Sequence, residues 1–108
     1  MEQSILIWLQ DWCTKQCNGE WEHDTGVQIH TVDNPGWWIG IDLEGTEAEA
    51  IAYVHPLVET SETNWYFYGF ANAKFTASGD LTKLEFLLRK FREIIENFHR
   101  EQNFSTSL

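Results

Sequence analysis

More than half of this 108-residue sequence contains no basic residue: no lysine or arginine occurs between Gln16 and Ala73. The same stretch holds ten of the 17 acidic residues: Glu20, Glu22, Asp24, Asp33, Asp42, Glu44, Glu47, Glu49, Glu59 and Glu62. Acids and bases balance in the rest of the chain, so the net charge of −10 belongs to the middle. Nucleic acids and anionic membranes attract cations, so the sequence argues against both as partners. A basic protein or a cation fits this field better.

Cysteine, proline and long apolar runs are also scarce. The two cysteines, Cys13 and Cys17, stand four apart in a predicted helix, a spacing that favours neither a disulfide nor a zinc site. No apolar run is long enough to span a membrane, and the first residues lack the pattern of a secretory signal. We therefore expect a cytoplasmic protein with no cofactor and no bound metal.

The spacing of apolar residues predicts a helix, then strands, then a second helix. Apolar residues recur at helical intervals over residues 3–17, and Ser4 is the expected N-cap. Alternating patterns predict strands at about residues 26–32, 36–43, 51–58, 64–71 and 73–77. A sustained helical repeat predicts a helix over residues 80–101 with Asp80 as its N-cap.

This order of elements predicts an α+β fold with two layers. We expect one domain over residues 1–108, in which the long C-terminal helix packs on one face of a meander-like antiparallel sheet of four to five strands. Pro56 lies inside the third predicted strand. Proline cannot donate to a strand ladder, so that strand should be at an edge of the sheet or contain a bulge.

The sequence contains no recognised catalytic signature. There is no glycine-rich phosphate loop, no nucleophile elbow and no HExxH motif. A small metal-assisted enzyme using His23, Asp24 and Asp33 is one alternative, although adjacent residues do not easily reach a single ion. An adaptor or structural domain with exposed aromatic residues is another. We expect no enzymatic activity.

Tryptophan is the unusual residue type here, with six in the chain. Trp37 and Trp38 are adjacent in a predicted strand, so their side chains should point to opposite faces of the sheet. One of the two should lie on an uncovered face or beneath the N-terminal segment. An exposed tryptophan near Asp42 and Glu44 would suit a binding hot spot, and Trp38 is the candidate anchor.

Several blocks of the first half of the chain resemble the immunity protein 53 family. They include QCNG at 16–19, WEH at 21–23, TVDNPGW at 31–37 and IDLEGT at 41–46. Proteins of that family are encoded beside bacterial polymorphic toxins. The resemblance implies a protein that inhibits its cognate toxin by binding it. We expect it to act without catalysis, as a monomer or weak dimer.

The turn and packing residues of the shared blocks should hold the fold, and we expect acids of the middle of the chain to bind the toxin. We expect a structural role for Trp21, Glu22, His23, Asp33, Asn34, Pro35, Gly36 and Trp37. We expect the imidazole of His23 to bond backbone at the entry to the sheet. The predicted toxin-binding patch consists of Asp42, Glu44, Glu47 and Glu49. Its acidity indicates a basic toxin, with nucleases as candidates because they bind phosphates.

Overall fold

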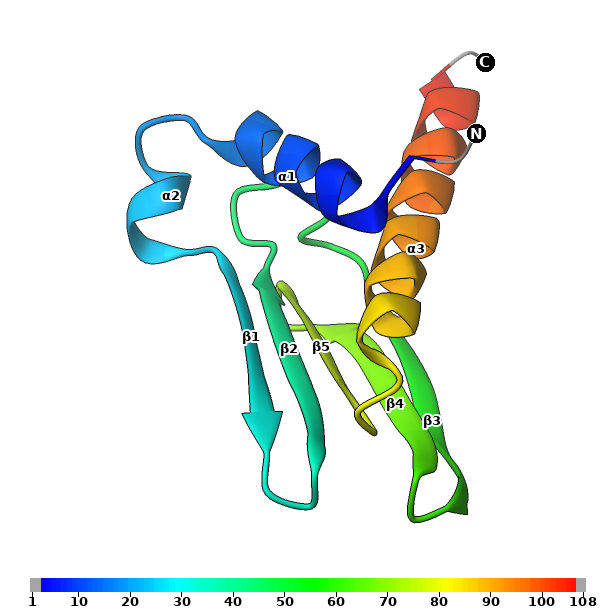
Figure 1. Cartoon of the computed structure of the whole chain (residues 1–108). Helices are drawn as coiled ribbons and strands as arrows, with labels where there is room; N and C mark the ends of the chain where they lie inside the picture. Colours follow the sequence, from blue (N-terminus) through cyan, green and yellow to red (C-terminus); the bar gives the residue numbers. More distant parts are fainter. Residues whose placement is uncertain (1–2, 107–108) are drawn as a thin grey trace.

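The computed structural model describes residues 3–106 of the chain, with the side chains of residues 3–101 (Figure 1). The elements are α1 (Ile5–Gln16), α2 (Trp21–Asp24), β1 (Val27–Val32), β2 (Gly36–Asp42), β3 (Tyr53–Ser61), β4 (Asn64–Ala71), β5 (Lys74–Gly79) and α3 (Leu84–Thr106). The predicted α+β fold is confirmed. The four-residue helix α2 was not predicted. No helix of the described residues is long and apolar enough to cross a membrane.

The five strands form one antiparallel sheet in the order β1-β2-β5-β4-β3. The expectation of a meander was wrong at one point, because β2 pairs with β5 and not with β3. Ile39 and Ile41 of β2 stand opposite Ala77 and Phe75 of β5, and all four side chains are fully buried. The apolar strands β2 and β5 therefore lie in the interior of the sheet, and β3 lies at an edge. Pro56 in β3 predicted this edge position.

Helices α1 and α3 pack against the same face of the sheet and share one core. The ring of Phe91 in α3 lies 5.2 Å from Trp12 of α1 and 5.0 Å from Phe75 of β5. Leu87, Leu88 and Ile95 continue the buried stripe of α3. On the other face, Val54 and Phe67 are exposed.

Helix α3 begins four residues later than the sequence predicted and ends later as well. Asp80 does not cap it. Instead, Asp80 accepts a hydrogen bond from the backbone N–H of Thr82 (2.8 Å) and closes a turn that precedes the helix. Ser4 is the N-cap of α1, as expected, because its hydroxyl accepts from the backbone N–H of Leu6.

Candidate functional site

The segment between α1 and β1 is organised by two side chains that bond to its backbone. The side-chain oxygen of Asn18 accepts from the N–H groups of Glu20 (2.9 Å) and Trp21 (3.0 Å). The Glu22 carboxylate accepts from the N–H groups of Asn18 (3.0 Å) and Gly19 (2.9 Å). Hydrogen bonds from its own backbone N–H and from these two groups lower the pKa of Glu22. These reciprocal bonds form α2.

Within the WEH block, Trp21 and His23 differ. Trp21 is buried and packs edge-on against Trp12, with ring centroids 5.9 Å apart. His23 is exposed on α2, and its ring has no hydrogen-bond partner among the described residues. The expectation that His23 bonds backbone at the entry to the sheet is therefore wrong. His23 is exposed to solvent on α2.

The DNPGW block forms the β1–β2 hairpin turn and the first residues of β2. Residues 33–35 make the turn, and Val32 pairs with Gly36 across it. A Cβ atom on Gly36 would lie 2.4 Å from the carbonyl oxygen of Gly79, so the position has no room for a side chain. The indole Nε1 of Trp37 donates to the backbone oxygen of Leu81 (3.0 Å). These contacts support a structural role for the block.

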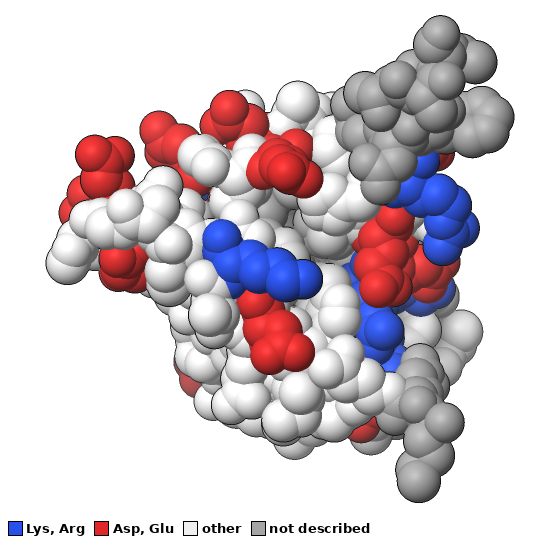
Figure 2. Space-filling model, turned by 90° about the horizontal axis from the view of Figure 1, so that it is seen from above, with Lys and Arg blue, Asp and Glu red and all other residues white. Residues whose placement is uncertain are grey.

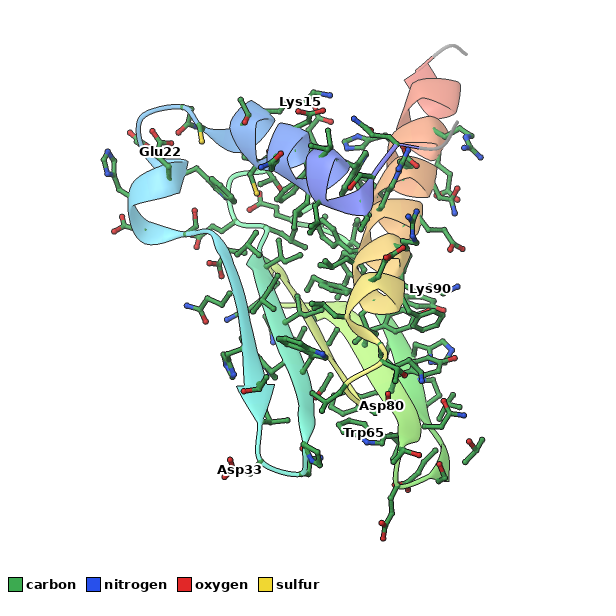
Figure 3. All side chains as sticks on the ribbon, in the orientation of Figure 1. Lys15, Glu22, Asp33, Trp65, Asp80 and Lys90 are labelled. Carbon is green, nitrogen blue, oxygen red and sulfur yellow. The ribbon has the colours of Figure 1, made fainter. Side chains whose placement is uncertain are left out.

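The metal site considered as an alternative is not assembled. Asp24 precedes β1 and Asp33 follows it, so the six residues of that strand separate them. At about 3.3 Å per residue the strand alone spans roughly 20 Å, too far for both carboxylates to reach one ion. Figure 3 shows Asp33 at one end of β1 and Glu22, next to His23, beyond the other. No cluster of metal-binding side chains occurs anywhere in residues 3–101.

The four acids of the predicted patch lie on two different parts of the fold. Asp42 ends β2, where its carboxylate accepts from the N–H of Gly26 (3.0 Å) and lies 4.0 Å from the ammonium of Lys74. The other three, Glu44, Glu47 and Glu49, are exposed on the connection between β2 and β3. Asp42 is thus engaged within the sheet, whereas the connection presents its carboxylates outward.

The connection acids keep their charge exposed in spite of local contacts. The Glu49 carboxylate accepts from the N–H of Gly45 (3.1 Å), and the Glu47 carboxylate lies 3.0 Å from Nδ1 of His99 on α3. Each of these two contacts involves one oxygen atom of its carboxylate, Oε2 of Glu49 or Oε2 of Glu47. Of the three connection glutamates, Glu47 lines a hollow of about 830 Å³ between α1, α3 and the connection.

We call the exposed acids of the α2 segment and of the β2–β3 connection the acidic end: Glu20, Glu22, Asp24, Glu44, Glu47 and Glu49. Figure 2 shows acidic atoms gathered without basic ones on the side of α2, whereas both signs mix on the side of α3. On α3, three acids each pair with a basic residue three or four positions away, at 2.9 to 3.4 Å. No such cation neutralises the acidic end among the described residues.

Trp38 lies on the sheet face opposite the helices, and Trp37 lies on the helix face, as their adjacency predicted. The Trp38 ring stacks on His30 of β1 with centroids 4.9 Å apart, and the Lys74 ammonium of β5 is 5.5 Å from it. A Cβ atom on Gly40 would meet this ring at 2.3 Å, so the glycine makes room for the indole. Trp38 is half-buried and held by three strands. A role as binding anchor stays a prediction.

Fold and surface together describe an acidic α+β protein with a group of exposed acids on the α2 segment and the β2–β3 connection. The family model of immunity protein 53 matches residues 6–96. The chain therefore belongs to the immunity protein 53 family. The match continues past the blocks at residues 16–46, through the sheet and into α3. Comparisons with curated proteins and with solved structures return no significant match.

Proposed function

We propose that this protein binds a cognate bacterial toxin and neutralises it as a stoichiometric, non-catalytic inhibitor in the cytoplasm. The observation that carries the proposal is the match to the immunity protein 53 family over most of the chain.

The acidic end supports a basic toxin domain as the partner. Its exposed carboxylates face solvent without paired lysine or arginine in the described part of the chain, so they create a negative field that attracts cationic surfaces. Toxins that bind phosphates, such as nucleases, carry that charge. The field steers their approach, and apolar contacts such as those of Trp38 hold the complex.

The decisive experiment is a titration of the toxin domain encoded beside this gene. Residual toxin activity should fall in proportion to added immunity protein and reach zero at one equivalent. A catalytic antagonist would instead inactivate many equivalents with time. Cells that express the toxin domain should survive only when they also express this protein. Full toxin activity at excess immunity protein would refute the proposal.

The role of charge can be tested with two matched triple variants. Changing Glu44, Glu47 and Glu49 to Gln removes three charges from the acidic end, and changing Glu85, Glu93 and Glu96 to Gln removes three from α3. We expect the first variant to associate about tenfold more slowly at low salt, with the difference shrinking as salt screens charges beyond about 8 Å. The second should associate nearly as fast as the wild type. Equal rates for both variants would show that the acidic end does not steer the toxin.

A further inference from the structure

Strand β1 is an open edge of the sheet. It is the first strand in the order β1-β2-β5-β4-β3, and no strand of the described residues pairs with its outer side. Figure 1 shows β1 at the margin of the sheet with no element beside it. An edge strand presents unpaired N–H and C=O groups that another chain can use.

The register shows which backbone groups of β1 point outward. Asp42 donates its N–H to the carbonyl of Gly26 (3.0 Å), so these two residues are a hydrogen-bonded pair at the start of the β1–β2 ladder. Hydrogen-bonded and non-hydrogen-bonded pairs alternate along antiparallel strands. The N–H and C=O groups of Val27, Ile29 and Thr31 therefore face away from β2. Among the described side chains, one contacts these outward groups: Nδ1 of His30 lies 3.2 Å from the carbonyl oxygen of Thr31.

The two edges of the sheet differ in how they are protected. Strand β3, at the other edge, contains Pro56 and has two irregularities in its pairing with β4. Proline and irregular pairing are devices that stop an edge from recruiting further strands. Strand β1 has neither, because its six residues pair with β2 in one continuous register and contain no proline, lysine or arginine. The β3 edge is thus protected against further pairing, whereas the β1 edge is a regular strand that can accept another.

The charges around β1 indicate what kind of strand fits there. The strand itself has no charged residue except the titratable His30, while Asp24 and Asp33 are exposed just beyond its two ends. Antiparallel pairing of two copies would bring Asp24 of one copy near Asp33 of the other at both ends, with no cation between them. Like charges so placed oppose self-pairing. An extended segment with a basic residue near each end is complementary.

We propose that β1 is where the toxin adds a strand: an extended segment of the toxin, basic near both ends, pairs with the outward groups of Val27, Ile29 and Thr31. This inference rests on the proposed function, since it takes the toxin as the partner. Main-chain hydrogen bonds supply the affinity in this mode of recognition, and flanking side chains supply the selectivity. The segment continues the sheet next to the His30–Trp38 stack and lies beside α2 of the acidic end.

The test is amide hydrogen exchange of the whole protein, free and bound to the toxin domain encoded by the neighbouring gene. We expect the amides of Val27, Ile29 and Thr31 to exchange freely in the free protein and at least about tenfold more slowly in the complex. A complex that forms without protecting these amides would overturn the inference and leave the proposed function standing. Failure of the wild-type protein to bind would overturn both. Protection of the same amides in a dimer without toxin would assign the edge to a second copy and also overturn it.

A pair of variants at one position separates backbone from side chain. Ile29→Pro removes the backbone N–H of residue 29, which faces away from β2, and so takes no hydrogen bond from the β1–β2 ladder. Ile29→Ala keeps that N–H and shortens the side chain. We expect Ile29→Pro to raise the Kd for the toxin domain by about tenfold or more, and Ile29→Ala by less than about threefold. Thermal unfolding verifies that each variant folds. If Ile29→Pro does not fold, the exchange experiment decides alone; equal affinities of two folded variants would contradict the inference.

Discussion

Asp80 is the residue on which the junction between β5 and α3 most depends. The residue is 3% exposed, and its carboxylate accepts from the backbone N–H groups of Trp65 (2.9 Å) and Thr82 (2.8 Å) and from the Lys83 ammonium (2.8 Å). Figure 3 shows Asp80 beside Trp65 at the foot of the sheet. Asp80→Asn would remove the charge and turn an amide NH2 toward groups that are themselves donors. Each hydrogen bond to a buried charge contributes about 1.5–3 kcal/mol, and one amide oxygen can still accept, so we expect a loss of about 2–4 kcal/mol.

Urea denaturation at neutral pH measures this loss directly. The exposed glutamate Glu85, which pairs with Arg89 on α3, is the control: Glu85→Gln should cost less than about 0.5 kcal/mol because exposed ion pairs contribute little. A change below that size for Asp80→Asn as well would refute the reasoning, since it would mean that the buried network stabilises nothing.

The same carboxylate gives the protein an acid-dependent stability. Burial on its own would raise the pKa of Asp80, but hydrogen bonds from Lys83, Thr82 and Trp65 outweigh it and hold the pKa well below its ordinary value of 3.8. A pKa lower in the folded than in the unfolded state stabilises the fold above the unfolded pKa, and this contribution is lost as pH falls. The gap in unfolding free energy between wild type and Asp80→Asn should therefore narrow below about pH 4. A gap that stays constant down to pH 2 would contradict the assignment.

Three further predictions concern the N-terminal third. The indole Nε1 of buried Trp21 has no partner among the described residues, so Trp21→Phe should cost about 1 kcal/mol or less and Trp21→Ala about 3–5 kcal/mol in denaturant unfolding; equal costs would contradict the reasoning that Trp21 stabilises the core through ring packing and not through its N–H. His23→Ala should change stability by less than about 0.5 kcal/mol, because the ring is exposed, and a larger drop in Tm would contradict the described position. A thiol reagent should modify exposed Cys17 before Cys13, whose pKa is raised by burial and by Cys17; the reverse order, read by mass spectrometry, would contradict this.

Local patterns in the sequence predicted the elements well, because periodicity reports which face of each element is buried. The apolar repeat of α3 and the alternation of β2 are examples. The start of α3 was misjudged for a physical reason: an aspartate before an apolar helix can cap a preceding turn as easily as the helix itself. At Asp80 the tertiary partner Trp65 decides between these, and it is 15 residues away in sequence.

The order of strands and the place of the acids depend on contacts that no local pattern contains. Strand β5 lies beside β2 because Phe75 and Ala77 fit against Ile41 and Ile39, which is a long-range match. The engagement of Asp42 depends on a similar long-range contact. Its carboxylate accepts from the N–H of Gly26, 16 residues away in sequence, whereas Glu44 is exposed on the connection. Helix α2 could have been predicted from the sequence, because Asn18, a residue type that caps helices, stands four positions before Glu22.

The central place of β5 has a consequence for how the chain comes together. The pair β1–β2 and the pair β3–β4 do not touch through strand ladders; each is joined to the other only by β5. When the ribosome has synthesised β1 to β4, the chain can therefore form two separate hairpins, β1–β2 and β3–β4. The edges of β2 and β4 that later pair with β5 are still unpaired at that stage. The sheet can close only when residues 74–79 emerge and insert between them, and α3, which covers the joined strands, follows directly. Formation of the core is thus a late and concerted event in synthesis, and truncation before residue 74 should leave two disconnected hairpins with no smaller version of the fold.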